Sequence, residues 1–183
     1  RAAGPVGVRA FPAAAGEQGD ESPGSVVETT AEDWPFLVDS VSAALRARGL
    51  GIQRVLHPIV GVERDADGQI EAVLHPREAT RRESIMHFDL DRRLPPDQLQ
   101  GLEEAIRKVL GDVRATVADF PSMADRARRM VQLAGAGAAR YTDEEVDETV
   151  AFLEWLLHDN FIFLGYREYR FRDGAISVVP DSG

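Results

Sequence analysis

The most informative stretch of the chain is Ala-Glu-Asp-Trp-Pro-Phe-Leu-Val-Asp-Ser-Val, residues 31–41. The six residues before it, 25–30, place adjacent valines between polar residues, a composition that favours a β-strand. Asp33 can accept hydrogen bonds from the free amides of a first helical turn, and Pro35 suits a position that needs no amide partner. The stretch therefore predicts a strand that passes directly into a helix capped by Asp33.

That helix is predicted to be amphipathic. Apolar residues recur at helical spacing, so one stripe of the helix should face a core. The stripe consists of Leu37, Val41, Ala44 and Leu45. Gly49 is placed to end the helix, because glycine readily adopts the left-handed conformation found just beyond helix C-termini.

The next segment predicts a hairpin and a further strand. Residues 52–64 are rich in strand-forming residues, Asp65-Ala66-Asp67-Gly68 is a strong turn signal, and residues 70–74 supply the returning strand. Residues 84–90 then alternate between apolar and polar side chains, which predicts a half-buried strand. Its apolar side consists of Met86, Phe88 and Leu90.

A second helix is predicted to begin at residues 95–97 and to carry an apolar stripe. Residues 113–120 fit either a continuation of this helix or a short strand, and the continued stripe favours the helix. Pro121 should kink or restart the helix, because proline lacks an amide hydrogen. A third helix is then expected over residues 123–134.

The order of these elements is close to the ferredoxin-like α+β pattern, an antiparallel sheet with two helices. In that pattern a fourth strand usually follows the second helix. If residues 113–120 are helical, the alternating stretch at residues 6–11 can fill that edge by pairing with residues 25–30. Residues 12–24, rich in Ala, Gly and Pro, are predicted to form a loop.

The C-terminal part predicts a linker, a helix and a hairpin. Residues 135–138 alternate Gly and Ala, and a capping box at Thr142 and Glu145 opens the next helix. We expect an aromatic-rich strand over residues 161–171 and a returning strand over residues 175–179. Two strands are too few to be stable alone.

The chain is therefore expected to have three parts. They are an α+β domain at residues 1–111, a helical connector and linker at residues 112–140, and a helix plus hairpin at residues 141–183 that starts a further module. The chain begins at Arg1 and ends at Gly183 just after a strand, which predicts a piece of a longer polypeptide.

Composition excludes several classes of protein. The 183 residues include no cysteine, so a disulfide scaffold, a thiolate metal site and a cysteine nucleophile are excluded. The formal net charge of −10 argues against general nucleic-acid binding, which needs a basic face. No apolar run approaches the roughly 20 residues that span a bilayer, so no membrane partner is expected.

The sequence contains no strong motif for catalysis, cofactor binding or metal binding. No glycine-rich dinucleotide fingerprint and no His-Glu-x-x-His motif occurs, so no cofactor and no metal are expected in these residues. His57 and His75 both lie in Leu-His-Pro triplets at the open end of the hairpin, where ordinary strand-end histidines are favoured over a metal site. Alternation places Ser84 on the opposite face from His87 and Asp89, which argues against a hydrolytic set.

The strand-to-helix loop resembles the start of an ACT domain, a small ferredoxin-like module that typically binds amino acids and regulates metabolic enzymes. ACT domains often carry an acid-x-Pro-Gly-Leu pattern here, and Phe36 stands where that Gly would be. A ligand approaching the backbone would meet the ring, which counts against amino-acid binding at this loop. The candidate ligand or interface site is Asp33, Trp34, Pro35, Phe36 and Leu37. A well-capped helix stapled by Trp34 is the purely structural alternative.

More of the chain resembles the N-terminal region of the large bacterial NAD-dependent glutamate dehydrogenases. The resemblance covers most of residues 6–183, and the ordered set of segments is more specific than any one of them. The segments are Asp33–Val41, Val55–Pro58, Val62–Asp65, Glu83–Phe88, Val109–Arg114 and Phe161–Arg167.

This resemblance implies a long cytoplasmic polypeptide with ACT-like and PAS-like modules and a distal catalytic domain. That parent would oxidatively deaminate L-glutamate to 2-oxoglutarate and ammonia with NAD, and no catalytic residue is assigned to this chain. The chain is then expected to be a regulatory or oligomerisation region. Its expected partners are the rest of the polypeptide, a second copy in a homo-oligomer, and an amino-acid effector. A structural interaction module without a ligand is the alternative.

Overall fold

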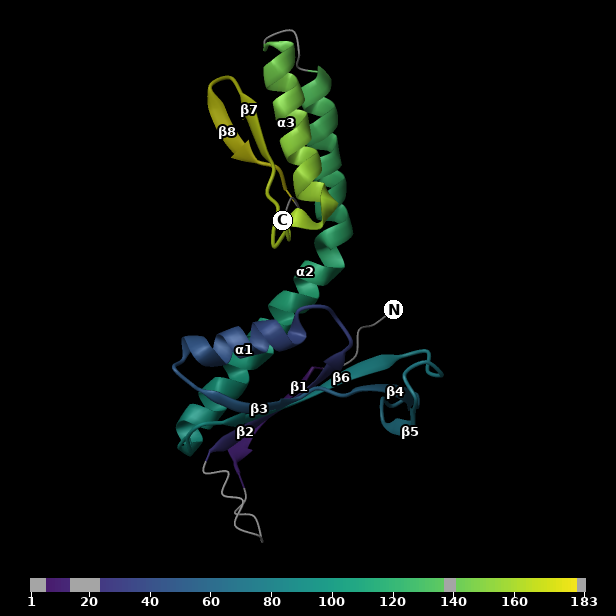
Figure 1. The fold of residues 1–183 in the computed structure, drawn as a ribbon, viewed down its shortest axis with the longest axis vertical. Coiled ribbons are helices and arrows are strands. Elements are labelled where there is room, and N and C mark those ends of the chain that lie inside the picture. The colour runs from purple at the N-terminus through teal and green to yellow at the C-terminus, as the bar shows by residue number, and fades with distance from the viewer. Residues whose placement is uncertain (1–5, 14–23, 137–140, 181–183) are drawn as a thin grey trace. The chain divides into compact units, whose positions relative to one another are not determined.

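The structure is a computed structural model, and it describes residues 6–13, 24–136 and 141–180. Most of the predicted 12–24 loop and the end of the predicted 135–138 linker lie outside the described residues. The chain divides into two compact units, residues 1–114 and residues 115–183 (Figure 1). Among the described residues, no helix is long and apolar enough to cross a membrane.

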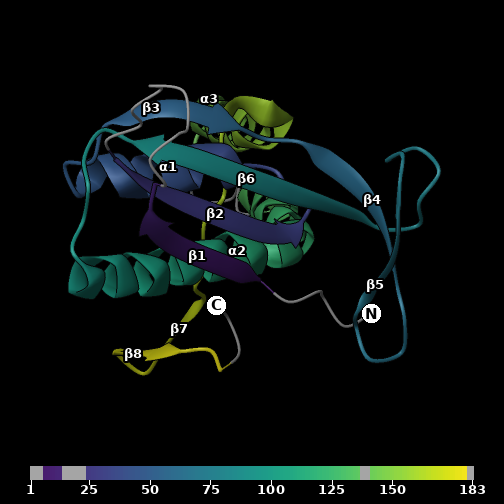
Figure 2. The same ribbon diagram turned by 90° about the horizontal axis from the view of Figure 1, so that it is seen from below.

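The first unit is a six-stranded antiparallel sheet with two helices on one face (Figure 2). Its strands are β1 (Gly7–Pro12), β2 (Ser25–Glu32), β3 (Ile52–Leu56), β4 (Ile59–Arg64), β5 (Ile70–Leu74) and β6 (Arg82–Leu90). Its helices are α1 (Leu37–Ala47) and the first part of α2 (Pro96–Ala136). The strand order is β1-β2-β6-β4-β5, and β3 also pairs with β6. The predicted ferredoxin-like α+β fold is confirmed.

Strand β1 occupies the edge where the usual fourth strand would lie. It pairs antiparallel with β2, from Gly7 opposite Thr30 to Pro12 opposite Ser25, as predicted. The amide of Ala10 donates a hydrogen bond to a carboxylate oxygen of the α2 residue Glu103 at 2.8 Å. That contact satisfies an amide on the edge strand, which would otherwise be open to pairing with another chain.

The prediction of one continuous strand over residues 52–64 is wrong, because the strand is split at His57 and Pro58. Proline cannot donate a ladder hydrogen bond, and here the Pro58 carbonyl accepts from the amide of Ile85 at 3.0 Å. Strand β3 therefore pairs with one end of β6 and β4 with the other. The predicted hairpin is confirmed for β4 and β5, joined through the Asp65–Gly68 turn.

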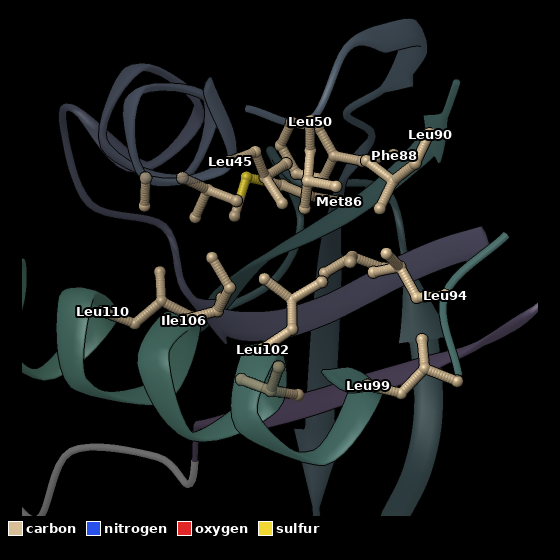
Figure 3. Packing of buried hydrophobic residues seen from close by; sticks show 14 of the residues in the cluster. Leu45, Leu50, Met86, Phe88, Leu90, Leu94, Leu99, Leu102, Ile106 and Leu110 are labelled. Carbon is tan, nitrogen blue, oxygen red and sulfur yellow. The ribbon is translucent and has the colours of Figure 1, made fainter. Parts of the chain in front are cut away.

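The core of the first unit lies between β6 and the two helices (Figure 3). Alternate β6 residues are fully buried, as predicted, and they meet apolar stripes from α1 and α2. The largest of these buried side chains are Met86, Phe88, Leu90, Leu37, Val41, Leu45, Ile106 and Leu110. The end of α1 is also as predicted, since Gly49 has φ +70° and its amide donates to the Arg46 carbonyl at 2.8 Å.

The predicted Asp33 cap of α1 is wrong. The residue before the helix is Phe36, and no side chain caps it. Asp33 is held on the sheet: its amide donates to the carbonyl of Arg82 at 3.1 Å, and its carboxylate lies 3.6 Å from the Arg82 guanidinium. Because the β2–β6 ladder extends to Glu32, the chain turns into α1 only over residues 34–36.

Helix α2 runs from Pro96 to Ala136, so residues 113–120 are helical. The predicted separate third helix is wrong, because the helix continues through Pro121. Proline removes one backbone hydrogen bond. Apolar positions continue at helical spacing beyond it, and Met123 and Ala127 are buried, which offsets that loss.

The second unit contains the end of α2, then α3 (Asp143–Trp155), a π-helical turn η2 (Leu156–Asn160), and the hairpin β7 (Tyr169–Arg172) and β8 (Ala175–Val178). The predicted strand over residues 161–171 is wrong for residues 161–168, which pair with no strand among the described residues. Aromatic packing holds part of this segment instead: the ring of Phe163 lies 6.3 Å from Phe120 and 5.4 Å from Phe161.

The predicted capping box of α3 is confirmed. The Glu145 amide donates to the Thr142 hydroxyl at 3.3 Å, and the Thr142 amide donates to the Glu145 carboxylate at 2.9 Å. The Thr142 hydroxyl also donates to the Glu145 carboxylate, at 3.0 Å. The hydrogen bond from the Thr142 amide, and then the one from its hydroxyl, lower the pKa of Glu145 below its ordinary value near 4.5.

We expect Thr142→Ala to destabilise α3 by about 1 kcal/mol, the usual cost of losing such a cap. Because the folded pKa of Glu145 is depressed, its contribution is complete above the unfolded pKa and is lost as pH falls through the folded value. Amide exchange of α3 measured from neutral to acidic pH checks both effects. Unchanged amide exchange of α3 in Thr142→Ala at neutral pH would contradict the capping account.

Candidate ligand or interface site

The loop between β2 and α1 contains the five predicted site residues. Trp34 is half-buried and packs against the core of the first unit, whereas Leu37 is a buried core residue. Pro35 and Phe36 are exposed. The structure therefore brings one exposed apolar pair to the surface of this loop, and Asp33 is tied to Arg82 beside it.

Phe36 has an unusual backbone conformation, with φ 67° and ψ 7°. This left-handed conformation costs a non-glycine residue about 1 kcal/mol. The Phe36 carbonyl accepts the first hydrogen bond of α1, from the Ser40 amide at 3.0 Å, and its ring is 44% exposed. The position thus keeps a backbone conformation that glycine adopts freely, while presenting an aromatic ring to solvent.

We expect Phe36→Gly to be more stable than Phe36→Ala by about 1 kcal/mol. Both substitutions remove the ring, but only glycine relieves the left-handed strain, and glycine is also the better residue before a helix. Chemical denaturation of the two variants measures the difference. An alanine variant as stable as the glycine variant would show that the backbone at this position is not strained.

A cluster of polar side chains lies on the sheet face opposite α1 and the first part of α2 (Figure 2). The His87 ring lies between two carboxylates, with Nδ1 3.2 Å from Glu28 and Nε2 3.1 Å from Asp89. The Nε of Arg54 donates to Asp89 at 2.6 Å. Each of these groups already has a partner of opposite charge or a hydrogen-bonding partner, so the cluster stabilises the pairing of β2, β3 and β6.

The histidines and Ser84 do not form a catalytic or metal site in the described part of the chain. His57 Nε2 lies 2.8 Å from the Ser84 hydroxyl, a pair that the sequence did not indicate. Ser84 is fully buried, so a substrate cannot reach it. His75 contacts the amide of Arg77, and no group of metal-ligating side chains occurs among the described residues.

The second unit contains a groove of about 800 Å³ between α2 and residues 164–167. On one wall the Arg126 guanidinium donates to Glu168 at 3.2 Å and lies 5.8 Å from the centre of the Tyr166 ring. Burial, and then a hydrogen bond to Glu168, raises the pKa of Tyr166 above its ordinary value. The sequence predicted helix along the α2 wall but did not mark that wall as part of a groove. It did not show the opposite wall, because that segment has no regular structure.

Residues 1–106, which hold the ferredoxin-like sheet and the start of α2, match the family described as "Glutamate dehydrogenase, ACT1 domain". The chain belongs to this family. The ACT1 match contains the complete candidate loop between β2 and α1.

Three similar proteins carry the name NAD-specific glutamate dehydrogenase. They come from Pseudomonas aeruginosa (38% identical over 162 residues, 87% of this chain), Halomonas elongata (35% over 161 residues, 86%) and Mycobacterium tuberculosis (27% over 167 residues, 87%). The matched part is 10% of each of these relatives, so the chain spans about a tenth of their length.

Proposed function

We propose that this ACT1-containing chain is a non-catalytic regulatory and assembly region of an NAD-dependent glutamate dehydrogenase in the cytoplasm. The full-length polypeptide would oxidatively deaminate L-glutamate to 2-oxoglutarate and ammonia, with NAD bound outside these residues. The names of the relatives support the activity, and the small share of their length that the chain matches supports a role outside the catalytic domain.

The observation that carries the proposal is the exposed ring of Phe36 on the loop where an ACT domain usually has glycine. A ring over the backbone obstructs close approach by a small amino acid, whereas an exposed aromatic side chain is common in contacts between proteins. We therefore propose that Pro35 and Phe36 contact another copy of the enzyme.

Sedimentation velocity of the full-length enzyme tests this interface. Phe36→Ser should weaken self-association at least about tenfold, the effect of losing roughly 1.4 kcal/mol of contact. Ile70→Ser is the matched control, because Ile70 is similarly exposed but lies on β5. An unchanged oligomer in Phe36→Ser would contradict the proposed interface.

Thermal unfolding with a panel of amino acids tests the ligand version of the site. The interface proposal predicts no shift in melting temperature at millimolar concentrations. A saturable rise with one amino acid, abolished by a substitution at Asp33, would make the loop an effector site instead.

The structural alternative without a ligand is supported by the packing of Trp34 and Leu37, which belong to the core of the first unit. On that alternative the loop serves only to start α1. Phe36→Ser would then alter neither the oligomer nor the response to amino acids, and it would change only the stability of the unit.

A further inference from the structure

The hairpin of β7 and β8 has two chemically different faces. Register pairs Tyr169 with Val178 and Phe171 with Ile176, and alternation places all four side chains on the same side. These four side chains are 50–71% exposed. The other face carries Arg170, Arg172, Ala175 and Ser177.

Such a hairpin is not expected to be stable by itself. Two strands provide too few contacts for independent stability in water, and the usual remedy is a further strand or a helix packed on the apolar face. A contiguous set of exposed aromatic and β-branched side chains is also the kind of patch that marks an interaction surface. The opposite face carries polar and small side chains, so these observations indicate an interaction surface on the apolar side only.

The size of the face indicates what covers it. Four such side chains offer on the order of 400 Å² of contact area, whereas a stable association of separate chains takes about 800 Å² from each partner. A segment of the same polypeptide needs less area, because its tether holds it at a high effective concentration. About nine-tenths of the length of the relatives lies outside the matched region and is available to supply that segment.

We propose that the face formed by Tyr169, Phe171, Ile176 and Val178 is the docking surface for an amphipathic segment of the same polypeptide outside these 183 residues. The hairpin is then the first part of a further module that only the longer chain completes. This inference rests on the proposed function in one respect, namely that the chain is part of a long dehydrogenase polypeptide.

Hydrogen exchange with mass spectrometry tests the docking surface. Peptides covering residues 169–178 should exchange at least about tenfold more slowly in the full-length polypeptide than in the 183-residue chain, because docking adds a free energy of opening. Peptides from β2 and β6 serve as internal references and should exchange at the same rate in both. Equal exchange of the hairpin in the two proteins would overturn the proposal.

Paired variants of the full-length polypeptide identify the face. Phe171→Ser with Ile176→Ser should return hairpin exchange to the rate seen in the 183-residue chain. Arg170→Ser with Arg172→Ser, on the other face, should leave the protection unchanged, and loss of protection in this control would also overturn the proposal. Protection that appears in the 183-residue chain as its concentration rises would assign the face to a second copy and overturn the intramolecular assignment.

Glutamate-dependent NADH formation by the same full-length sample separates this inference from the proposed function. A protected hairpin in a protein that forms no NADH would contradict the dehydrogenase assignment and leave the docking surface standing. Formation of NADH with an unprotected hairpin would overturn the docking surface alone.

Discussion

Leu45→Ala is expected to lower the free energy of unfolding of the first unit by about 3 kcal/mol, within the usual range for a buried leucine. Leu45 is fully buried on α1 and packs in the core that α1 shares with β6 and α2 (Figure 3). Truncation removes the transfer free energy of the side chain and leaves a cavity between packed elements that cannot fully close.

Urea denaturation followed by circular dichroism measures this loss. Leu56→Ala is the matched control, because the same substitution on β3 removes a side chain that is 51% exposed. We expect the control to cost less than about 1 kcal/mol, since surface substitutions change stability little. Equal losses for the two variants would show that Leu45 is not in the core.

Arg64→Met is expected to destabilise the first unit by about 3 kcal/mol, because it leaves the Glu83 carboxylate buried without its ionic partner. Arg64 Nε and Nη2 donate to the two Glu83 oxygens at 2.8 and 2.7 Å, and the Glu83 side chain is only 9% exposed. The hydrogen bond to Glu83 raises the pKa of Arg64 above its ordinary value, against the lowering effect of burial, and the charge of Glu83 adds to the rise.

Two comparisons separate this pair from an ordinary surface contact. Arg9→Met breaks a 3.9 Å contact to Glu28 between exposed groups, and it should cost less than about 0.5 kcal/mol. The double variant Arg64→Met with Glu83→Leu should regain part of the loss, because no buried charge is then left unpaired. A loss for Arg64→Met as small as that for Arg9→Met would contradict the buried ion pair.

Most of the sheet could be predicted, because the sequence patterns that specify its strands span only a few neighbouring residues. Period-two alternation in β6 and helical spacing in α1 each need only a short window of sequence, and both give the correct buried face. The pairing of β1 with β2 is a longer-range result. It follows from the fold pattern if residues 113–120 are helical, and the structure confirms it.

The errors arise where tertiary contacts override local preference. Asp33 has the chemistry of a helix cap, but its pairing with Arg82 keeps it on the sheet. Pro121 has the chemistry of a helix breaker, but α2 continues through it because the following turns bury Met123 and Ala127. Aromatic residues near Phe161 favour a strand, yet those rings pack on one another and on Phe120.

The candidate site was only partly visible in the sequence. The acid and proline before α1 marked the loop, but no sequence pattern showed that Phe36 takes a left-handed conformation or that Leu37 is buried. The contact between His57 and Ser84 also depends on the break after β3, which no sequence pattern indicated.

Glutamate-dependent NADH formation, compared between the full-length polypeptide and the 183-residue chain, tests the central proposal most directly. The proposal predicts steady NADH formation by the full-length polypeptide and none by the 183 residues, whatever glutamate and NAD concentrations are supplied. NADH formation by the 183-residue chain, or its absence from a folded full-length polypeptide, would contradict the account.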